Sequence, residues 1–172
     1  MAESHTETAR PADPVGRALH FCSYAFVLVG GILMAALTVM TVVSVLGRDL
    51  FSVPIPGDFE LVTMGTAIAV FLFLPYCHLQ RGNVVVDLFL SWAPRKVQIF
   101  FDGASGVLLA VIAAGLGWRM VLGGFDMHQY NDVSYILALP TWPVFAMAAP
   151  ALFLLAVSCV YTAFRDFREM AR

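Results

Sequence analysis

Residues 19–47 read LHFCSYAFVLVGGILMAALTVMTVVSVLG and contain no Asp, Glu, Lys or Arg. Three more stretches, at 59–79, 103–118 and 136–164, are nearly as apolar, with almost no ionisable side chain near their centres. A hydrocarbon core about 30 Å thick needs about 20 apolar residues in one helical span. With flanking residues included, the sequence predicts an all-α membrane protein whose four transmembrane helices lie at about 19–47, 59–79, 97–122 and 141–164.

The composition agrees with a membrane protein and argues against nucleic-acid binding. Of the 172 residues, 60% are hydrophobic and 13% are charged, whereas about a quarter of the residues in a typical soluble domain are charged. The net charge is -2, and the 10 Lys and Arg residues are spread over several segments. Nucleic-acid binding requires a concentrated basic patch, so we expect membrane lipid and no nucleic acid around this chain.

The distribution of basic residues predicts the orientation of the chain. Only Arg48 and Arg119 lie on one side of the predicted membrane. The other side carries the remaining eight, Arg10, Arg17, Arg81, Arg95, Lys96, Arg165, Arg168 and Arg172. Because Lys and Arg accumulate in cytoplasmic segments, we expect a multi-pass protein of a bacterial inner membrane with both termini in the cytoplasm.

The expected organisation is a single membrane domain, residues 18–168, between two short tails. Residues 1–17 form a polar segment with two prolines, which predicts a disordered cytoplasmic tail. Residues 169–172 are expected to form a second cytoplasmic tail.

The segment between the second and third spans is apolar but too short to cross a membrane. We interpret residues 83–94 as an amphipathic helix lying in the cytoplasmic interface. A β-strand at 84–86 is the alternative, but an unpaired strand leaves its backbone groups without partners. The residues expected to place this helix at the interface are Arg81, Asp87, Trp92, Arg95 and Lys96.

Two connections are expected on the external side. In the first, Pro54, Pro56 and Gly57 end one helix and form a turn, after which Asp58 is expected to be the N-cap of the second span. The second is a longer loop at 123–140, rich in polar and aromatic residues.

Glu60 is the acidic residue closest to a span and has two interpretations. An intramembrane carboxylate often marks an ion pathway. However, Glu60 falls in the first turn of its helix, where the helix dipole favours a negative charge near water. We therefore predict a structural pair between Glu60 and Arg48 across the first hairpin, with proton coupling as the alternative.

Other chemistry has little support in the sequence. A haem site would need axial ligands on facing helices, and His20 and His78 are predicted to lie near the same membrane face. Histidines in contact with water or lipid headgroups are the more common case. We find no nucleophile with a base, no metal-ligand cluster and no phosphate-binding loop, so no enzyme activity and no cofactor are expected.

Small residues recur at a spacing of four in the predicted spans. Such residues let helices approach closely in lipid, where packing drives association. The pairs are Gly31 with Ala35, Gly65 with Ala69, Gly106 with Ala110 and Ala113 with Gly117.

The order of four motifs resembles the small membrane subunit, DctQ-type, of tripartite ATP-independent periplasmic (TRAP) transporters. These motifs are VVSVLGRDLF at 42–51, PIPGDFEL at 54–61, QRGNVVVDLF at 80–89 and LALPTWP at 137–143. The chain departs from the family pattern at Ser44, where Asn is frequent.

The resemblance implies two partners, a large membrane subunit and a periplasmic substrate-binding protein, commonly one for an organic acid. The large subunit would hold sodium and substrate and move like an elevator. This chain would be a fixed scaffold, with Arg48 and Glu60 as a structural clasp. The external polar contacts would be Asp49, Asp58, Asp126 and Asp132. The alternative is a small proton-coupled antiporter acting as a homodimer.

Overall fold

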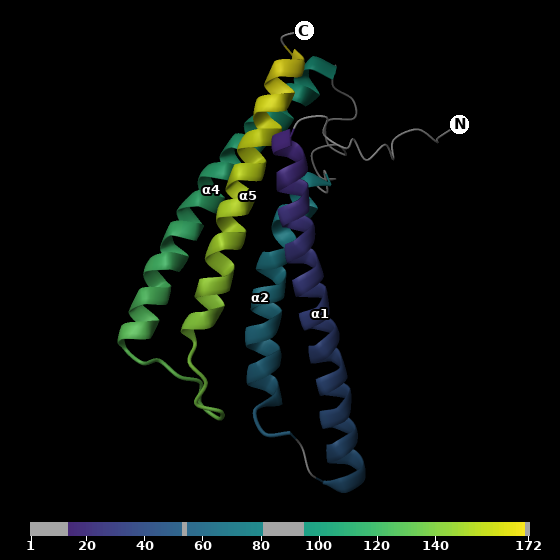
Figure 1. Cartoon of the computed structure of the whole chain (residues 1–172), viewed down its shortest axis with the longest axis vertical. Helices are drawn as coiled ribbons and strands as arrows, with labels where there is room; N and C mark the ends of the chain where they lie inside the picture. Colours follow the sequence, from purple (N-terminus) through teal and green to yellow (C-terminus); the bar gives the residue numbers. More distant parts are fainter. Residues whose placement is uncertain (1–13, 53–54, 81–94, 171–172) are drawn as a thin grey trace, which may run out of the picture.

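The computed structural model describes residues 14–52, 55–80 and 95–170, and these residues form four α-helices (Figure 1). The helices are α1 (Pro14–Phe51), α2 (Asp58–Leu79), α4 (Arg95–Gln129) and α5 (Trp142–Met170). Each is long and apolar enough to cross a membrane. The predicted fold class, an all-α membrane protein with four spans, is therefore confirmed.

The helices differ from the predicted spans mainly at their ends. Residues 14–17, expected in the tail, form the first turn of α1, and residues 169–170 remain in α5. Pro14 suits a first turn, because its φ angle is already helical and its missing N–H has no intrahelical partner there. The rest of both predicted tails, residues 1–13 and 171–172, lies outside the described residues.

The predicted interfacial helix at 83–94 also lies outside the described residues. Arg81, Asp87 and Trp92 therefore have no structural account. Arg95 and Lys96, expected to follow that helix, are the first two residues of α4.

The α4 helix continues past the predicted loop start at Gly123 and ends at Gln129. Gly123 and Gly124, at the predicted start of the loop, pack against Phe145 of α5. A Cβ at Gly123 would lie 3.3 Å from Phe145 Cε1, and one at Gly124 would lie 3.1 Å from Phe145 Cβ. These glycines thus serve helix packing rather than chain reversal.

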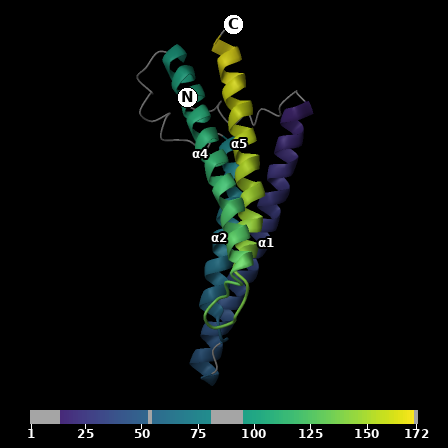
Figure 2. The ribbon, with the colours of Figure 1, turned by 90° about the vertical axis from the view of Figure 1, so that its left-hand side faces the viewer.

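The four helices form two antiparallel hairpins, α1 with α2 and α4 with α5. Contacts between α2 and α5 join the hairpins, and α1 touches α5 only slightly. The helices consequently lie in the order α4, α5, α2, α1 across a layer (Figure 1), and the view turned by 90° shows this layer from its side (Figure 2). The hairpins diverge toward the end that carries the α1–α2 turn and the α4–α5 loop (Figure 1). We call this end the loop end.

Small side chains fill the contact between α4 and α5. The buried cluster consists of Ala110, Ala113, Leu152, Leu155, Ala156 and Cys159. A Cβ at Gly106 would lie 3.3 Å from Ala163 Cβ, and one at Gly117 would lie 3.4 Å from Leu152 Cβ. Both predicted small-residue pairs of α4 therefore lie at a helix contact, whereas a Cβ at Gly31 of α1 would meet nothing within 4 Å.

The α1 helix packs along a narrow stripe and exposes most of its apolar surface. Within the most apolar 18-residue stretch of α1, only 6% of the residues are buried inside the chain. Its 38 residues span about 57 Å at 1.5 Å per residue, longer than the hydrocarbon core of about 30 Å. The other faces of α1 are therefore available to lipid or to another membrane protein.

Candidate functional site

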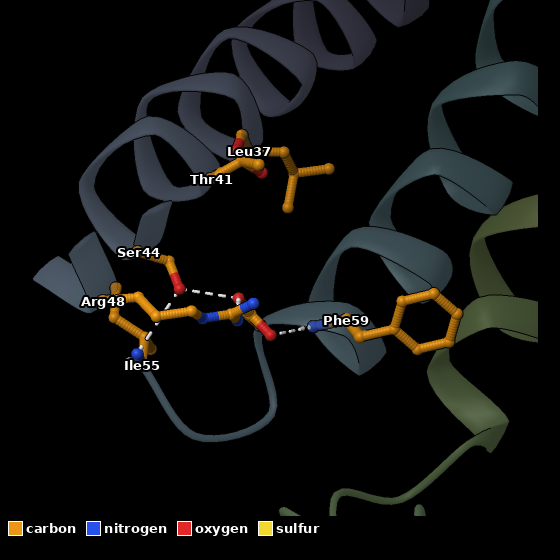
Figure 3. A network of polar contacts seen from close by, with 7 residues as sticks. Leu37, Thr41, Ser44, Arg48, Ile55 and Phe59 are labelled. Carbon is orange, nitrogen blue, oxygen red and sulfur yellow. Dashed lines mark hydrogen bonds and ion pairs between the residues drawn. The ribbon is translucent and has the colours of Figure 1, made fainter. Parts of the chain in front are cut away.

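Ser44, near the end of α1, organises the turn between α1 and α2 (Figure 3). Its side chain has no exposed surface. Its hydroxyl donates to Asp58 Oδ2 at 2.6 Å and accepts the N–H of Ile55 at 3.4 Å (Figure 3). A hydroxyl that donates and accepts at once ties both sides of the turn to α1.

Asp58 is the first helical residue of α2 and is not the N-cap expected from the sequence. Gly57 occupies the cap position with a left-handed φ of 76° and no side-chain cap bond. Asp58 Oδ1 accepts the N–H of Phe59 at 2.7 Å (Figure 3). Its negative charge lies in the first turn, where the helix dipole is favourable.

Arg48 pairs with Asp58, so the predicted pair between Arg48 and Glu60 is wrong. Arg48 Nη2 lies 3.5 Å from Asp58 Oδ2, and the Arg48 side chain is 62% exposed. Two residues along a helix correspond to about 200° of rotation, since one turn takes 3.6 residues. Asp58 therefore faces α1, whereas Glu60 faces the opposite hairpin.

Glu60 accepts three hydrogen bonds from the loop between α4 and α5. The hydroxyl of Ser134 donates to Glu60 Oε2 at 2.7 Å. The backbone N–H of Ile136 donates to Oε1 at 2.8 Å, and that of Leu137 donates to Oε2 at 3.0 Å. We call this set of four residues the Glu60 site. It joins α2 to a segment more than 70 positions away in the sequence.

The loop at 130–141 is closed by its own hydrogen bonds. The N–H of Ser134 donates to the Leu139 carbonyl at 2.8 Å, and Val133 forms an isolated antiparallel bridge with Pro140. At the base of the loop, the Thr141 hydroxyl donates to Asp132 Oδ2 at 2.8 Å. These bonds hold the donors of the Glu60 site in one place.

Gly57 and Leu137 form a second contact between the turn and the loop. A Cβ added at Gly57 would overlap the side chain of Leu137. Leu137 thus packs directly on the α2 start, while its N–H binds Glu60. The positive φ of Gly57 and this close approach both require glycine at that position.

The four predicted external carboxylates have different environments. Asp58 and Asp132 are engaged in the turn and in the loop, as described above. Asp49 and Asp126 are exposed near the loop-end termini of α1 and α4. The sequence analysis did not predict the hydrogen bonds of Ser44 and Ser134. For Ser44 there was a signal in the sequence, since it is a polar residue at the end of an apolar span.

His78, considered as a haem ligand, faces α5. Its Nε2 lies 2.9 Å from the hydroxyl oxygen of Thr162. His20, the second candidate, lies in α1.

The family model for the DctQ component of tripartite ATP-independent periplasmic transporters matches residues 37–169 of this sequence. The chain belongs to the DctQ family. This confirms the resemblance found in the sequence motifs, and the matched region contains every residue of the Glu60 site and of the α1–α2 turn. Searches of curated proteins and of solved structures gave no match.

Membership in the DctQ family defines the general role of the chain. It is the small component of a TRAP transporter, a multi-pass membrane protein and not an enzyme. Transporters of this family are tripartite, with a large membrane component and a periplasmic binding protein as the other parts. The contacts of the turn and of the Glu60 site therefore belong to one subunit of a larger assembly.

Proposed function

We propose that this DctQ protein is a non-catalytic scaffold subunit of a sodium-coupled importer for an organic acid. It would brace a large elevator subunit, which binds sodium and substrate, and contribute to docking of the periplasmic substrate-binding protein. In this proposal the chain sits in the bacterial inner membrane with both termini in the cytoplasm. The excess of Lys and Arg on the terminal side supports that orientation.

The observation that carries the proposal is the placement of polar contacts in the described residues. The contacts between different helical hairpins that involve a carboxylate lie at the loop end. Within the spans, the hydroxyls of Thr38 and Ser158 donate to carbonyls of their own helices, Met34 and Leu154, at 2.8 Å each. The contact between His78 and Thr162, which joins the hairpins, lies toward the opposite end of α2 from Glu60. A transport path needs polar groups directed at a substrate or ion near the membrane centre, so this pattern favours a scaffold.

The Glu60 site favours a structural role for Glu60 over proton coupling, the basis of the antiporter alternative. Its carboxylate accepts a hydroxyl and two backbone N–H groups, all within 3.0 Å. Such bonds stabilise the charged form and fix its position. A coupling carboxylate must instead exchange its proton during each cycle.

The loop end presents a surface suited to the periplasmic binding protein. Tyr135 at the loop tip is fully exposed, and Ile136 beside it is 64% exposed. Asp49 and Asp126 add exposed carboxylates at the same end. Tyrosine is frequent among the residues that dominate binding energy at protein interfaces.

Co-purification tests the scaffold proposal. We expect tagged chain, extracted in mild detergent, to bring down the large membrane subunit, and uptake to be lost when the chain is absent. Tagged chain that emerges alone, together with full uptake by the large subunit without it, would reject the proposal. For the antiporter alternative, Glu60→Gln would have to abolish cation or drug efflux by this chain alone.

A further inference from the structure

A groove between α4 and α5 opens near the loop end, away from the Glu60 site. It encloses about 540 Å³, within the 300–1,000 Å³ range of small-molecule pockets. Gly124, Ala146 and Ala149 contribute small side chains to its lining, and Phe125 and Phe153 contribute aromatic rings. The small residues leave space between the helices, and the groove is almost entirely apolar.

The polarity of the groove changes along its length. At its mouth lie His128 and Trp142, whose rings meet edge to face with centroids 5.6 Å apart. These two residues lie at the ends of the membrane-spanning parts of α4 and α5, where the interface begins. Trp and His can donate hydrogen bonds, and Trp is enriched at the depth of lipid headgroups. The rest of the lining is apolar.

The depth of the groove corresponds to one leaflet of a bilayer. From Trp142 to Phe153 the α5 helix advances 11 residues, or about 16 Å at 1.5 Å per residue. The hydrocarbon core is about 30 Å thick, so this is roughly half of it. The residues that line the groove extend no deeper than Phe153 on α5 and Met120 on α4, so the groove ends near the middle of the membrane.

We propose that this groove binds one acyl chain of a membrane phospholipid, with the headgroup at His128 and Trp142. A helix of a partner protein would cross both leaflets, whereas the groove ends after one. A phospholipid in a single leaflet has a polar end at the interface and an apolar chain about as long as the groove. The proposal goes beyond the scaffold function and does not depend on it.

Ala146 and Pro150 lie four residues apart in α5, and both line the groove. Both residues are exposed in the groove. A larger side chain at Ala146 therefore fills part of the groove without removing a buried contact.

The test uses the full chain reconstituted in vesicles of phosphatidylethanolamine and phosphatidylglycerol, then extracted in mild detergent. Native mass spectrometry counts the phospholipid retained on each chain. We expect Ala146→Phe to lower retention about tenfold, the loss expected when two methylenes are no longer buried. The matched control is Ala36→Phe on the exposed surface of α1, which should retain lipid like the wild type.

A second variant keeps the proposal testable if Ala146→Phe does not fold. His128→Leu combined with Trp142→Phe alters only exposed side chains at the mouth and should also lower retention. Unchanged retention in both variants would overturn the proposal. So would normal retention by Ala146→Phe together with loss of the large subunit in co-purification, because a partner helix would then be the occupant.

Discussion

Glu60 Oε2 and the hydroxyl of Ser134 lie 2.7 Å apart and connect the two helical hairpins at the loop end. The hairpins otherwise meet mainly between α2 and α5, and they diverge toward this end (Figure 1). The bond therefore acts at the point where the hairpins are least supported by helix packing. It couples the conformation of an exposed loop to the start of α2.

Replacing Glu60 tests this coupling. Glu60→Gln keeps one carbonyl oxygen but places an amide NH2 among three donors, so the loop at 130–141 should detach from α2. Hydrogen exchange at the Ile136 and Leu137 amides should accelerate while overall helix content is unchanged. Asp126→Asn, an exposed carboxylate in α4, is the matched control. Unaltered protection at both amides in Glu60→Gln would show that the bonds do not hold the loop.

Gly57→Ala should destabilise the turn more than an ordinary glycine substitution. The left-handed φ of 76° costs about 1–2 kcal/mol for a residue with a Cβ, and Leu137 must also move. Thermal unfolding in detergent measures the loss. Gly31→Ala is the control, since its Cβ meets nothing and removing a helical glycine gains about 0.5–1 kcal/mol. Equal melting temperatures for the two variants would contradict this account of the turn.

Ser44→Ala and Arg48→Gln separate the buried hydrogen bonds of the turn from its exposed ion pair. Ser44 is fully buried and serves both Asp58 and the N–H of Ile55, whereas Arg48 is 62% exposed. Leaving buried groups unsatisfied costs more than losing a surface ion pair. The melting temperature should therefore fall further in Ser44→Ala. A larger fall in Arg48→Gln would reverse this assignment.

Tyr135→Ala tests the proposed docking surface. If the loop tip contacts the periplasmic binding protein, removing this fully exposed ring should weaken docking by about tenfold or more. Binding to the assembled membrane complex in nanodiscs provides the measurement. Phe164→Ala, at the opposite end of the bundle and 73% exposed, should have no effect. Equal affinity for the Tyr135 variant and the wild type would place docking elsewhere.

The spans were predictable because their physics is local. Twenty or so apolar residues satisfy the hydrocarbon core wherever they occur in a chain. The first turn was also predictable, since Pro56 and Gly57 do not continue a helix. The loop was predicted to begin at Gly123, whereas α4 continues beyond it. Glycine occurs both in turns and at close helix contacts, and only the position of Phe145 distinguishes the two cases.

The Glu60 site was not predictable because its partners depend on helical phase and tertiary packing. A shift of two residues decides whether Asp58 or Glu60 faces Arg48, and Arg48 in fact pairs with Asp58. Two of the three donors to Glu60 are backbone N–H groups, which have no residue signature. The residue types near Glu60 could suggest an acid in a helix start, but not which loop would bind it.

Solute uptake into vesicles is the most direct test of the claim that this DctQ protein is a scaffold. The chain alone, the large subunit alone and the two together are reconstituted with the binding protein and a sodium gradient. The account predicts no uptake by the chain alone and full uptake only when both membrane subunits are present. Uptake of solute by the chain without its large partner would contradict it.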